Sequence, residues 1–132
     1  MTKIIKVLFV ILFLVFVSCT KEEREQRRED NLLSGWELVH LTVNQPYETW
    51  TFDTANVITR YVDGLEGEFY QIGNYVLSQE NYKYYVTIDS MDMYIDGKFL
   101  ILDLDERILV MERIAWEKNG NPFLRKEFIK IN

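Results

Sequence analysis

The chain has little of what many small proteins use for stability and catalysis. Its 132 residues include one cysteine, one histidine and two prolines. A single cysteine cannot form a disulfide within the chain, and the count excludes a zinc site built from histidine and cysteine. His40 could act as a base beside Asp53 or Glu48, but its pattern favours an ordinary residue on a half-wet strand face. The sequence therefore predicts no catalytic residue, no metal and no cofactor.

Positive charge is also scarce. The chain has 15 basic and 21 acidic residues and a net charge of −6. Residues 1–18 hold two lysines and no acid, so the rest of the chain carries −8. We do not expect such an acidic domain to bind nucleic acid or anionic lipid head groups through charge. A group of aspartates is crowded enough to suggest calcium but lacks the spacing of a calcium loop: Asp89, Asp92, Asp96, Asp103 and Asp105.

The first residues give the clearest indication of where the protein works. Lys3 and Lys6 lead into an apolar run over residues 7–17, which ends in Phe-Val-Ser and then Cys19. A basic start, a short apolar run and a small residue before a cleavage point are typical of a secretory signal. About eleven residues are too few to cross a bilayer as a helix. The lone cysteine after this run resembles a bacterial lipobox, so we predict a lipoprotein signal peptide over residues 1–18 and lipidation of Cys19.

Residues 19–31 connect this anchor to the rest of the chain. Residues 20–31 contain no apolar side chain, so we predict a disordered tether that forms at most a transient helix through Glu/Arg pairs. The segment Cys-Thr-Lys-Glu-Glu at 19–23 resembles the export signal of surface lipoproteins of the Bacteroidota. The expected location is the bacterial outer membrane, with the protein lipid-anchored and exposed at the cell surface.

From residue 32 onward the chain alternates between apolar and polar residues, as strands do. The alternation on both sides of the polar turn 53–56 predicts a hairpin, and Asp96-Gly97 predicts a two-residue hairpin turn. Asn119-Gly120 is expected to separate the last two strands, with Pro122 at the start of the final one. Eight or nine strands with short turns and no convincing helix leave two architectures, a closed up-and-down barrel or two packed sheets. Closure is favoured because it removes exposed edges.

A set of short motifs carries a resemblance to a known family. Gly-Trp-Glu-Leu at 35–38, Trp-Thr-Phe-Asp at 50–53, Gly-Asn-Tyr-Val-Leu at 73–77, Leu109-x-Met111 and Phe128 resemble the small lipocalin-like lipoproteins of the Bacteroidota. The turn 53–56 departs from that pattern because it lacks the usual glycine. The resemblance covers residues 33–131 and implies an all-β domain over residues 32–132, an eight-stranded antiparallel barrel shaped as a lipocalin-like calyx. It implies little about the ligand.

The 19 aromatic residues are the remaining candidates for function. One set is expected on inward faces, where it lines a ligand cavity or fills the core, and a second set, Tyr47, Tyr70, Tyr85 and Trp116, on outward faces or near loops. Three functions stay open: an envelope lipoprotein that binds a small hydrophobic ligand, a non-enzymatic accessory subunit with a filled barrel that binds another envelope protein, and an envelope hydrolase, for which the sequence shows no nucleophile–base pair. The inward set is Trp36, Leu38, Trp50, Phe52, Tyr61, Tyr75, Leu77, Tyr84, Met111 and Phe128.

Overall fold

The computed structural model describes residues 2–115 and 124–132, without the side chains of residues 13–21 and 115. The chain divides into two compact units, Met1–Asp30 and Asn31–Asn132. The predicted features that involve Trp116, Asn119-Gly120 and Pro122 lie outside the described residues.

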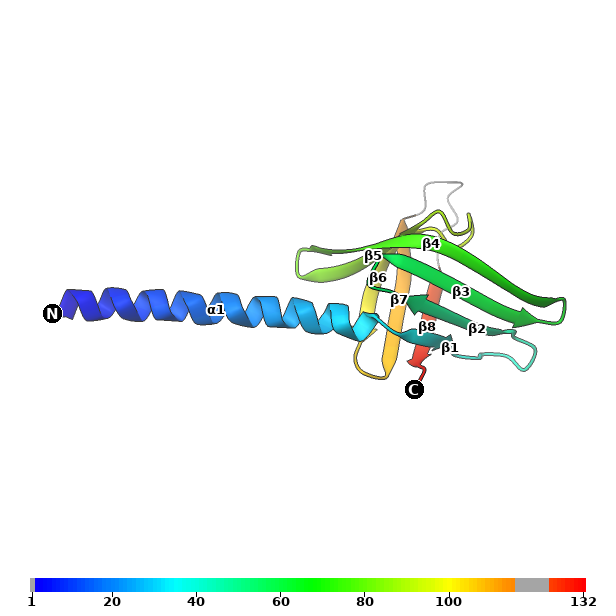
Figure 1. Cartoon of the computed structure of the whole chain (residues 1–132), viewed down its shortest axis with the longest axis horizontal. Helices are drawn as coiled ribbons and strands as arrows, with labels where there is room; N and C mark the ends of the chain where they lie inside the picture. The colour runs from blue at the N-terminus through cyan, green and yellow to red at the C-terminus, as the bar shows by residue number, and fades with distance from the viewer. Residues whose placement is uncertain (1, 116–123) are drawn as a thin grey trace. The chain divides into compact units, whose positions relative to one another are not determined.

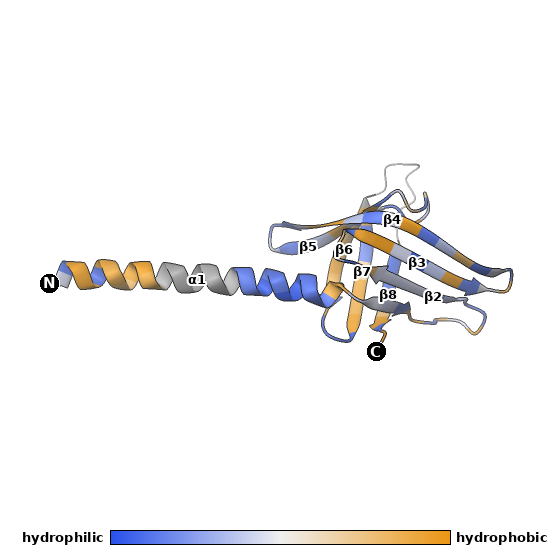
Figure 2. Ribbon diagram, viewed as in Figure 1, coloured by the Kyte–Doolittle hydropathy of each residue, from blue (hydrophilic) through white to orange (hydrophobic). Residues whose placement is uncertain are grey.

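The first unit is formed by the helix α1 (Thr2–Leu32). Figure 2 shows its first turns in the hydrophobic colour and its last turns in the hydrophilic colour. The helix continues through residues 20–31, where the sequence favoured a disordered tether. Glu23 and Arg27 are spaced one turn apart, and Gln26 Nε2 donates a hydrogen bond to Asp30 Oδ1 at 3.0 Å, so local pairs support the helix there. Over the described residues, no helix has an apolar stretch long enough to span a membrane.

The second unit is a closed barrel of eight strands, as predicted (Figure 1). Each strand pairs antiparallel with its neighbours in sequence, and the last strand pairs back with the first. Closure therefore gives every strand a hydrogen-bonded neighbour on both sides over at least part of its length, which satisfies much of the backbone of a chain this rich in apolar strands. The strands are β1 (Gly35–Leu38), β2 (Tyr47–Phe52), β3 (Val57–Gly64), β4 (Gly67–Glu80), β5 (Lys83–Asp89), β6 (Gly97–Leu104), β7 (Ile108–Ala115) and β8 (Leu124–Lys130).

The up-and-down order places alternate connections at opposite ends of the barrel. We call the end with the connections 39–46, 65–66 and 90–96 the mouth, and the end with the turns 53–56, 81–82 and 105–107 the base. The base is closed by Leu32, which has no exposed surface and whose carbonyl accepts a hydrogen bond of 3.0 Å from Trp36 Nε1. The two ends therefore differ, since apolar residues next to β1 seal the base while loops cover the mouth.

The interior of the barrel is filled by its own side chains. Apolar residues from seven of the strands have no accessible surface, so none of them borders a space that a water molecule could enter. Their rings are in contact: the centroids of Trp50 and Phe128 are 5.1 Å apart, and those of Phe52 and Tyr75 are 5.0 Å apart at an interplanar angle of 88°. The fully enclosed set is Trp36, Trp50, Ile58, Val86, Phe99, Leu109, Met111 and Phe128.

The segment 90–96 corrects one prediction. The sequence suggested a strand ending at the turn Asp96-Gly97, but β6 begins only at Gly97 and residues 90–96 form a loop. Asp96 Oδ1 accepts hydrogen bonds from the backbone N–H groups of Met91 and Asp92, and Asp92 Oδ1 accepts one from Tyr94. These side-chain bonds give the backbone an alternative to strand pairing.

The loop 90–96 packs tightly against the strands. Ile95 is buried, Met91 packs against the core, and Gly73 of β4 lies directly beneath the loop. A Cβ atom at Gly73 would come within 2.7 Å of the Met91 Cβ and 2.6 Å of the Asp89 carbonyl oxygen. Only glycine fits at this position, so the close approach of loop and strand depends on it.

Candidate functional site

An ionic cluster lies inside the barrel near the mouth. Glu48 of β2 has 4 % of its surface exposed and receives hydrogen bonds from Arg60 Nε of β3 and from Trp50 Nε1, each at 2.6 Å. Arg60 Nη2 donates to the second carboxylate oxygen at 3.2 Å. This fork geometry is the strongest arrangement for an Arg–carboxylate pair. The pair is thus held in place by the packed core on one side and by the strand pairing of β2 with β3 on the other.

The cluster continues from Arg60 to the loop that covers the mouth. Arg60 Nη1 donates to Gln71 Oε1 at 2.6 Å, and Gln71 Nε2 donates to Asp92 Oδ2 at 2.7 Å. On the other side of the loop, Arg113 Nη1 of β7 donates to the Tyr94 carbonyl at 2.7 Å. The loop 90–96 is therefore fastened to two strands that are not neighbours, β4 and β7, and closes the mouth over the charged residues.

The charges of the cluster compensate one another. Burial raises the pKa of Glu48, but the hydrogen bonds from Arg60 and Trp50 and the charges of Lys126 and Arg60 outweigh it, so this pKa lies below its usual value. Burial lowers the pKa of the Lys126 ammonium, although the charge of Glu48 acts in the opposite direction. The Lys126 Nζ lies 6.0 Å from the centre of the Trp50 ring. Glu48 is therefore held as a fully hydrogen-bonded anion next to cations.

This cluster is suited to structure rather than to acid–base chemistry. A carboxylate whose pKa is lowered is a poor proton acceptor near neutral pH, and both its oxygens are engaged by Arg60. The described residues contain no group of three or more His, Cys, Asp or Glu side chains that could hold a metal ion. We expect the Glu48–Arg60 pair to favour the observed register of β2 and β3, because a shifted register would leave a buried charge unpaired.

A second feature lies on the outside of the barrel, where tyrosines from three adjacent strands form a continuous row. Tyr61 of β3 is directly paired with Tyr70 of β4, and their ring centroids are 4.8 Å apart. The ring of Tyr47 of β2 meets that of Tyr61 edge-on, with centroids 6.3 Å apart. Tyr70 is 67 % exposed and Tyr47 38 % exposed, and Ile72 next to them on β4 is 65 % exposed. We call Tyr47, Tyr61, Tyr70 and Ile72 the tyrosine face.

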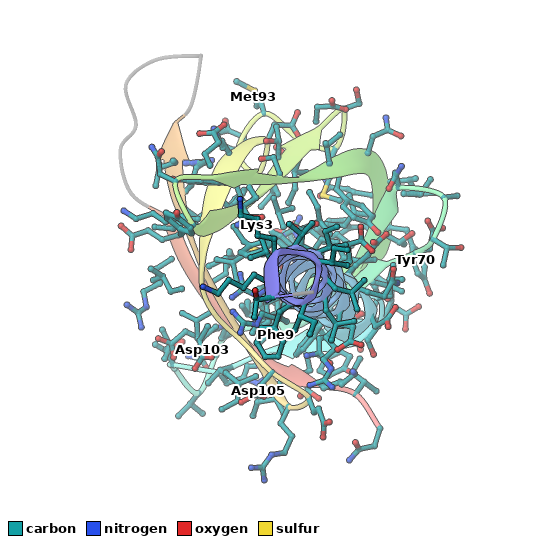
Figure 3. The ribbon with its side chains drawn as sticks, turned by 90° about the vertical axis from the view of Figure 1, so that its left-hand side faces the viewer. Lys3, Phe9, Tyr70, Met93, Asp103 and Asp105 are labelled. Atoms are coloured by element: carbon teal, nitrogen blue, oxygen red, sulfur yellow. The ribbon has the colours of Figure 1, made fainter. Side chains whose placement is uncertain are left out.

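The tyrosine face is rigid and open. Cross-strand pairs on neighbouring strands hold the rings against one another, and the barrel beneath them is filled. In Figure 3 the Tyr70 side chain points away from the barrel. Rings held in this way lose little conformational freedom on contact with a partner, which is why tyrosine is frequent in binding surfaces.

The structure places the predicted inward set with one clear difference. Trp36, Leu38, Trp50, Phe52, Tyr75, Met111 and Phe128 are buried, while Leu77 and Tyr84 are partly buried. The prediction that Tyr61 points inward is wrong, because Ile58, Arg60 and Val62 form the inward face of β3. Arg60 interrupts the apolar residues of that face, so the alternation in the sequence did not identify it as the buried one.

The other predicted candidates lie apart from one another. His40 is exposed in the loop 39–46, where its Nε2 lies 3.2 Å from the Pro46 carbonyl oxygen. Asp53 belongs to the turn at the base, where its carboxylate accepts hydrogen bonds from the backbone N–H groups of Ala55 and Val57. Glu48 is committed to Arg60 and Trp50. The hypothetical base pairs of His40 with Asp53 or Glu48 are therefore not assembled.

Among the outward aromatics, Tyr85 of β5 is partly buried and lies beneath the Lys98 ammonium, 4.5 Å from its ring centre. It does not join the tyrosine face, since it is paired with Ser78, eight residues along β4 from Tyr70. Trp116 is outside the described residues. Among the described residues, the exposed aromatic rings of the predicted outward set therefore lie mainly on β2 and β4, next to Tyr61 of β3.

Comparisons of this chain with models of protein families, with characterised proteins and with solved structures find no match.

Proposed function

We propose that this protein is a lipid-anchored envelope protein whose lipocalin-like barrel serves as a rigid, non-enzymatic docking subunit for another envelope protein. The tyrosine face carries this proposal. It presents exposed aromatic rings on a barrel whose own interior needs none of them for packing. Exposed rings held by a filled scaffold are typical of the central contacts in protein interfaces.

The other candidate, a small hydrophobic ligand inside the barrel, receives less support. A ligand cavity of the usual size holds about 300 Å³ or more. Residues from β1, β2, β6, β7 and β8 border no water-sized space, so a ligand between them would have to displace packed side chains. Such displacement in a close-packed interior is costly.

Site-specific photocrosslinking tests the docking function. A photoreactive phenylalanine replaces Tyr70 in the full-length protein, and intact cells of the native host are irradiated. Tyr82 provides a matched control, because it is also a tyrosine and is 94 % exposed, but it lies in the turn 81–82 at the base. We expect one defined crosslinked product from position 70 and none from position 82. The product should disappear when Ile72→Asp is added on the same face. Equal labelling from both positions, or none from position 70, would contradict the proposal.

A ligand screen tests the alternative. Trp36 and Trp50 are fully buried, so their fluorescence reports any apolar molecule that enters the barrel. Fatty acids, sterols, haem and quinones should leave both this signal and the melting temperature unchanged. A saturable change in fluorescence with a rise in melting temperature would instead support a carrier.

Lipid anchoring rests on the sequence at residues 1–19. We expect Cys19→Ala to stall processing or to release the protein from membranes in fractionated cells, while Cys19→Ala leaves the fold of the barrel intact because Cys19 belongs to the other unit. Membrane association that is the same for both proteins, with cleavage at another position, would contradict lipidation.

A further inference from the structure

Basic side chains are missing from the surface around the tyrosine face. Between residues 41 and 82 the chain contains a single lysine, arginine or histidine, Arg60. Arg60 points inward, is 14 % exposed and is paired with Glu48. The outer surface of β2, β3 and β4 therefore has no positive charge of its own, although the chain has 15 basic residues in total.

Carboxylates border the same face on one side. Asp63 and Glu68 are directly paired at the end of the β3–β4 hairpin, and Asp63 is also paired with Tyr47. Glu66 lies in the connection between the two strands, and all three acids are exposed. In Figure 1 this hairpin projects at the same end as the β1–β2 connection. The row of rings thus ends in three carboxylates that lack a basic neighbour on these strands.

The behaviour of Tyr61 agrees with a negative environment. Partial burial, a hydrogen bond to Glu68 and the charges of Glu68 and Asp63 raise the pKa of Tyr61 to about 12. A site that opposes the formation of one more negative charge favours an added positive charge by the same electrostatics.

Building on the docking function, we propose that the tyrosine face binds an arginine-bearing segment of the partner protein. The guanidinium group is planar and weakly hydrated, so it stacks on tyrosine rings and also forms paired hydrogen bonds with a carboxylate. Rings and carboxylates stand side by side here: the row Tyr47, Asp63, Glu68 adjoins the row Thr49, Tyr61, Tyr70. An arginine can therefore lie over a tyrosine and reach an acid at once. Lysine offers a point charge without the planar stacking surface.

A direct binding measurement tests this inference. The probe is a fluorescein-labelled peptide of six Arg-Ser repeats, with lysine and glutamate versions of the same length as comparisons. Anisotropy is measured with the full-length protein at low and at physiological salt, because screening weakens exposed charge pairs. We expect the arginine peptide to bind more tightly than the lysine peptide and the glutamate peptide not to bind.

Matched charge reversals separate this site from the general acidity of the protein. Glu66→Lys with Glu68→Lys changes the charge at the tyrosine face, and Asp103→Lys with Glu106→Lys makes the same change near the base. Figure 3 places Asp103 away from Tyr70. The first pair should weaken binding about tenfold or more, and the control pair about twofold or less. Tyr70→Ala, which changes no charge, should weaken binding about fivefold through lost stacking.

Two outcomes would overturn the inference. Equal weakening by both charge-reversed pairs would show that the peptide senses only net charge. Equal binding of the arginine and lysine peptides that is insensitive to Tyr70→Ala would remove the role of the rings. If either result occurs while position 70 still crosslinks to a partner in cells, the docking function stands and the arginine-bearing partner is wrong. Loss of both arginine-specific peptide binding and the crosslink from position 70 would contradict the docking function itself. Circular dichroism of each variant verifies that the barrel is folded.

Discussion

Near the mouth, the inner and outer faces of β2, β3 and β4 reverse the usual distribution of polar and apolar residues. Inside, near the mouth, lie a glutamate, an arginine and a glutamine, while outside lies a row of tyrosines. On β3 the reversal occurs between consecutive residues, since Arg60 faces the interior and Tyr61 faces outward. The difference teaches that cross-strand partners, rather than hydrophobicity alone, decide which face is buried here. An arginine is tolerated inside because Glu48 is there to receive it.

The two tyrosines Tyr75 and Tyr70 provide the largest expected contrast, because they lie on opposite faces of the same strand. Tyr75 is 3 % exposed, packs edge-on against Phe52 and donates a hydrogen bond to the Asp53 carbonyl. Tyr75→Ala should lower the free energy of unfolding by about 4 kcal/mol, as for other large buried aromatics. Tyr70→Ala should change it by about 0.5 kcal/mol or less. Urea unfolding measures both, and similar losses would mean that the two faces do not differ as described.

The ion pair inside the barrel should give the next largest effect. Arg60→Met removes the partner of a buried carboxylate and should cost about 3 kcal/mol of unfolding free energy. Adding Glu48→Leu should restore part of that stability, because the unpaired carboxylate is then gone, while Trp50 Nε1 and Lys126 lose the anion that faces them. Chemical denaturation of the two single variants and the double variant forms a complete cycle. If the double variant were as unstable as the sum of the single variants, the two side chains would not be coupled.

Acid should lower the stability of the folded protein through the ionic cluster on the inner face. The folded-state pKa of Glu48 is lowered, so its stabilising contribution is present above about pH 4.5 and is lost as the pH falls through the folded-state value. The pKa of Asp92 is also lowered, chiefly by the hydrogen bond from the Tyr94 backbone, and acts in the same direction. Unfolding free energy between pH 7 and pH 3 should therefore fall more steeply for the natural protein than for the Glu48→Leu/Arg60→Met variant. Parallel curves would contradict this assignment.

The smallest expected effect is on the outer face and concerns titration rather than stability. Glu68→Gln removes a charge and an anionic hydrogen-bond acceptor beside Tyr61, so the raised pKa of about 12 should return toward 10. NMR of protein labelled at the tyrosine Cζ follows this ionisation. An unchanged titration of Tyr61 would mean that Glu68 is not its partner.

The strand pattern allowed most of the barrel to be predicted, because alternation and turn residues are local. The hairpin around 53–56 is an example, since Asp53 caps its own turn. The loop 90–96 was missed because Asp92 and Asp96 bond to nearby backbone, which competes with pairing that looks equally good in the sequence. A turn signal such as Asp96-Gly97 marks a break in a strand but does not show on which side the loop lies.

The ionic cluster could not be predicted in full, because Glu48, Arg60 and Gln71 meet only through the register of three strands. One signal was available. Each of these residues lies two positions from a buried residue on its own strand, as Glu48 does from Trp50, and residues at that spacing share a face. The tyrosine face was partly anticipated by Tyr47 and Tyr70, but the inclusion of Tyr61 required the correct face of β3.

The pairing of β1 with β8 has a consequence for the way in which the barrel is made. Every other strand pair joins neighbours in sequence and can form as soon as both strands exist, but β1 must wait for the last strand. Until then the free edges of β1 and β7 can pair with other chains. Trp36 and Leu38 on β1 also lack part of their packing before Phe128 arrives. A chain released before β8 would therefore expose the unpaired strand edges of β1 and β7 together with the hydrophobic interior. Incomplete chains are thus the form of this protein most prone to aggregate.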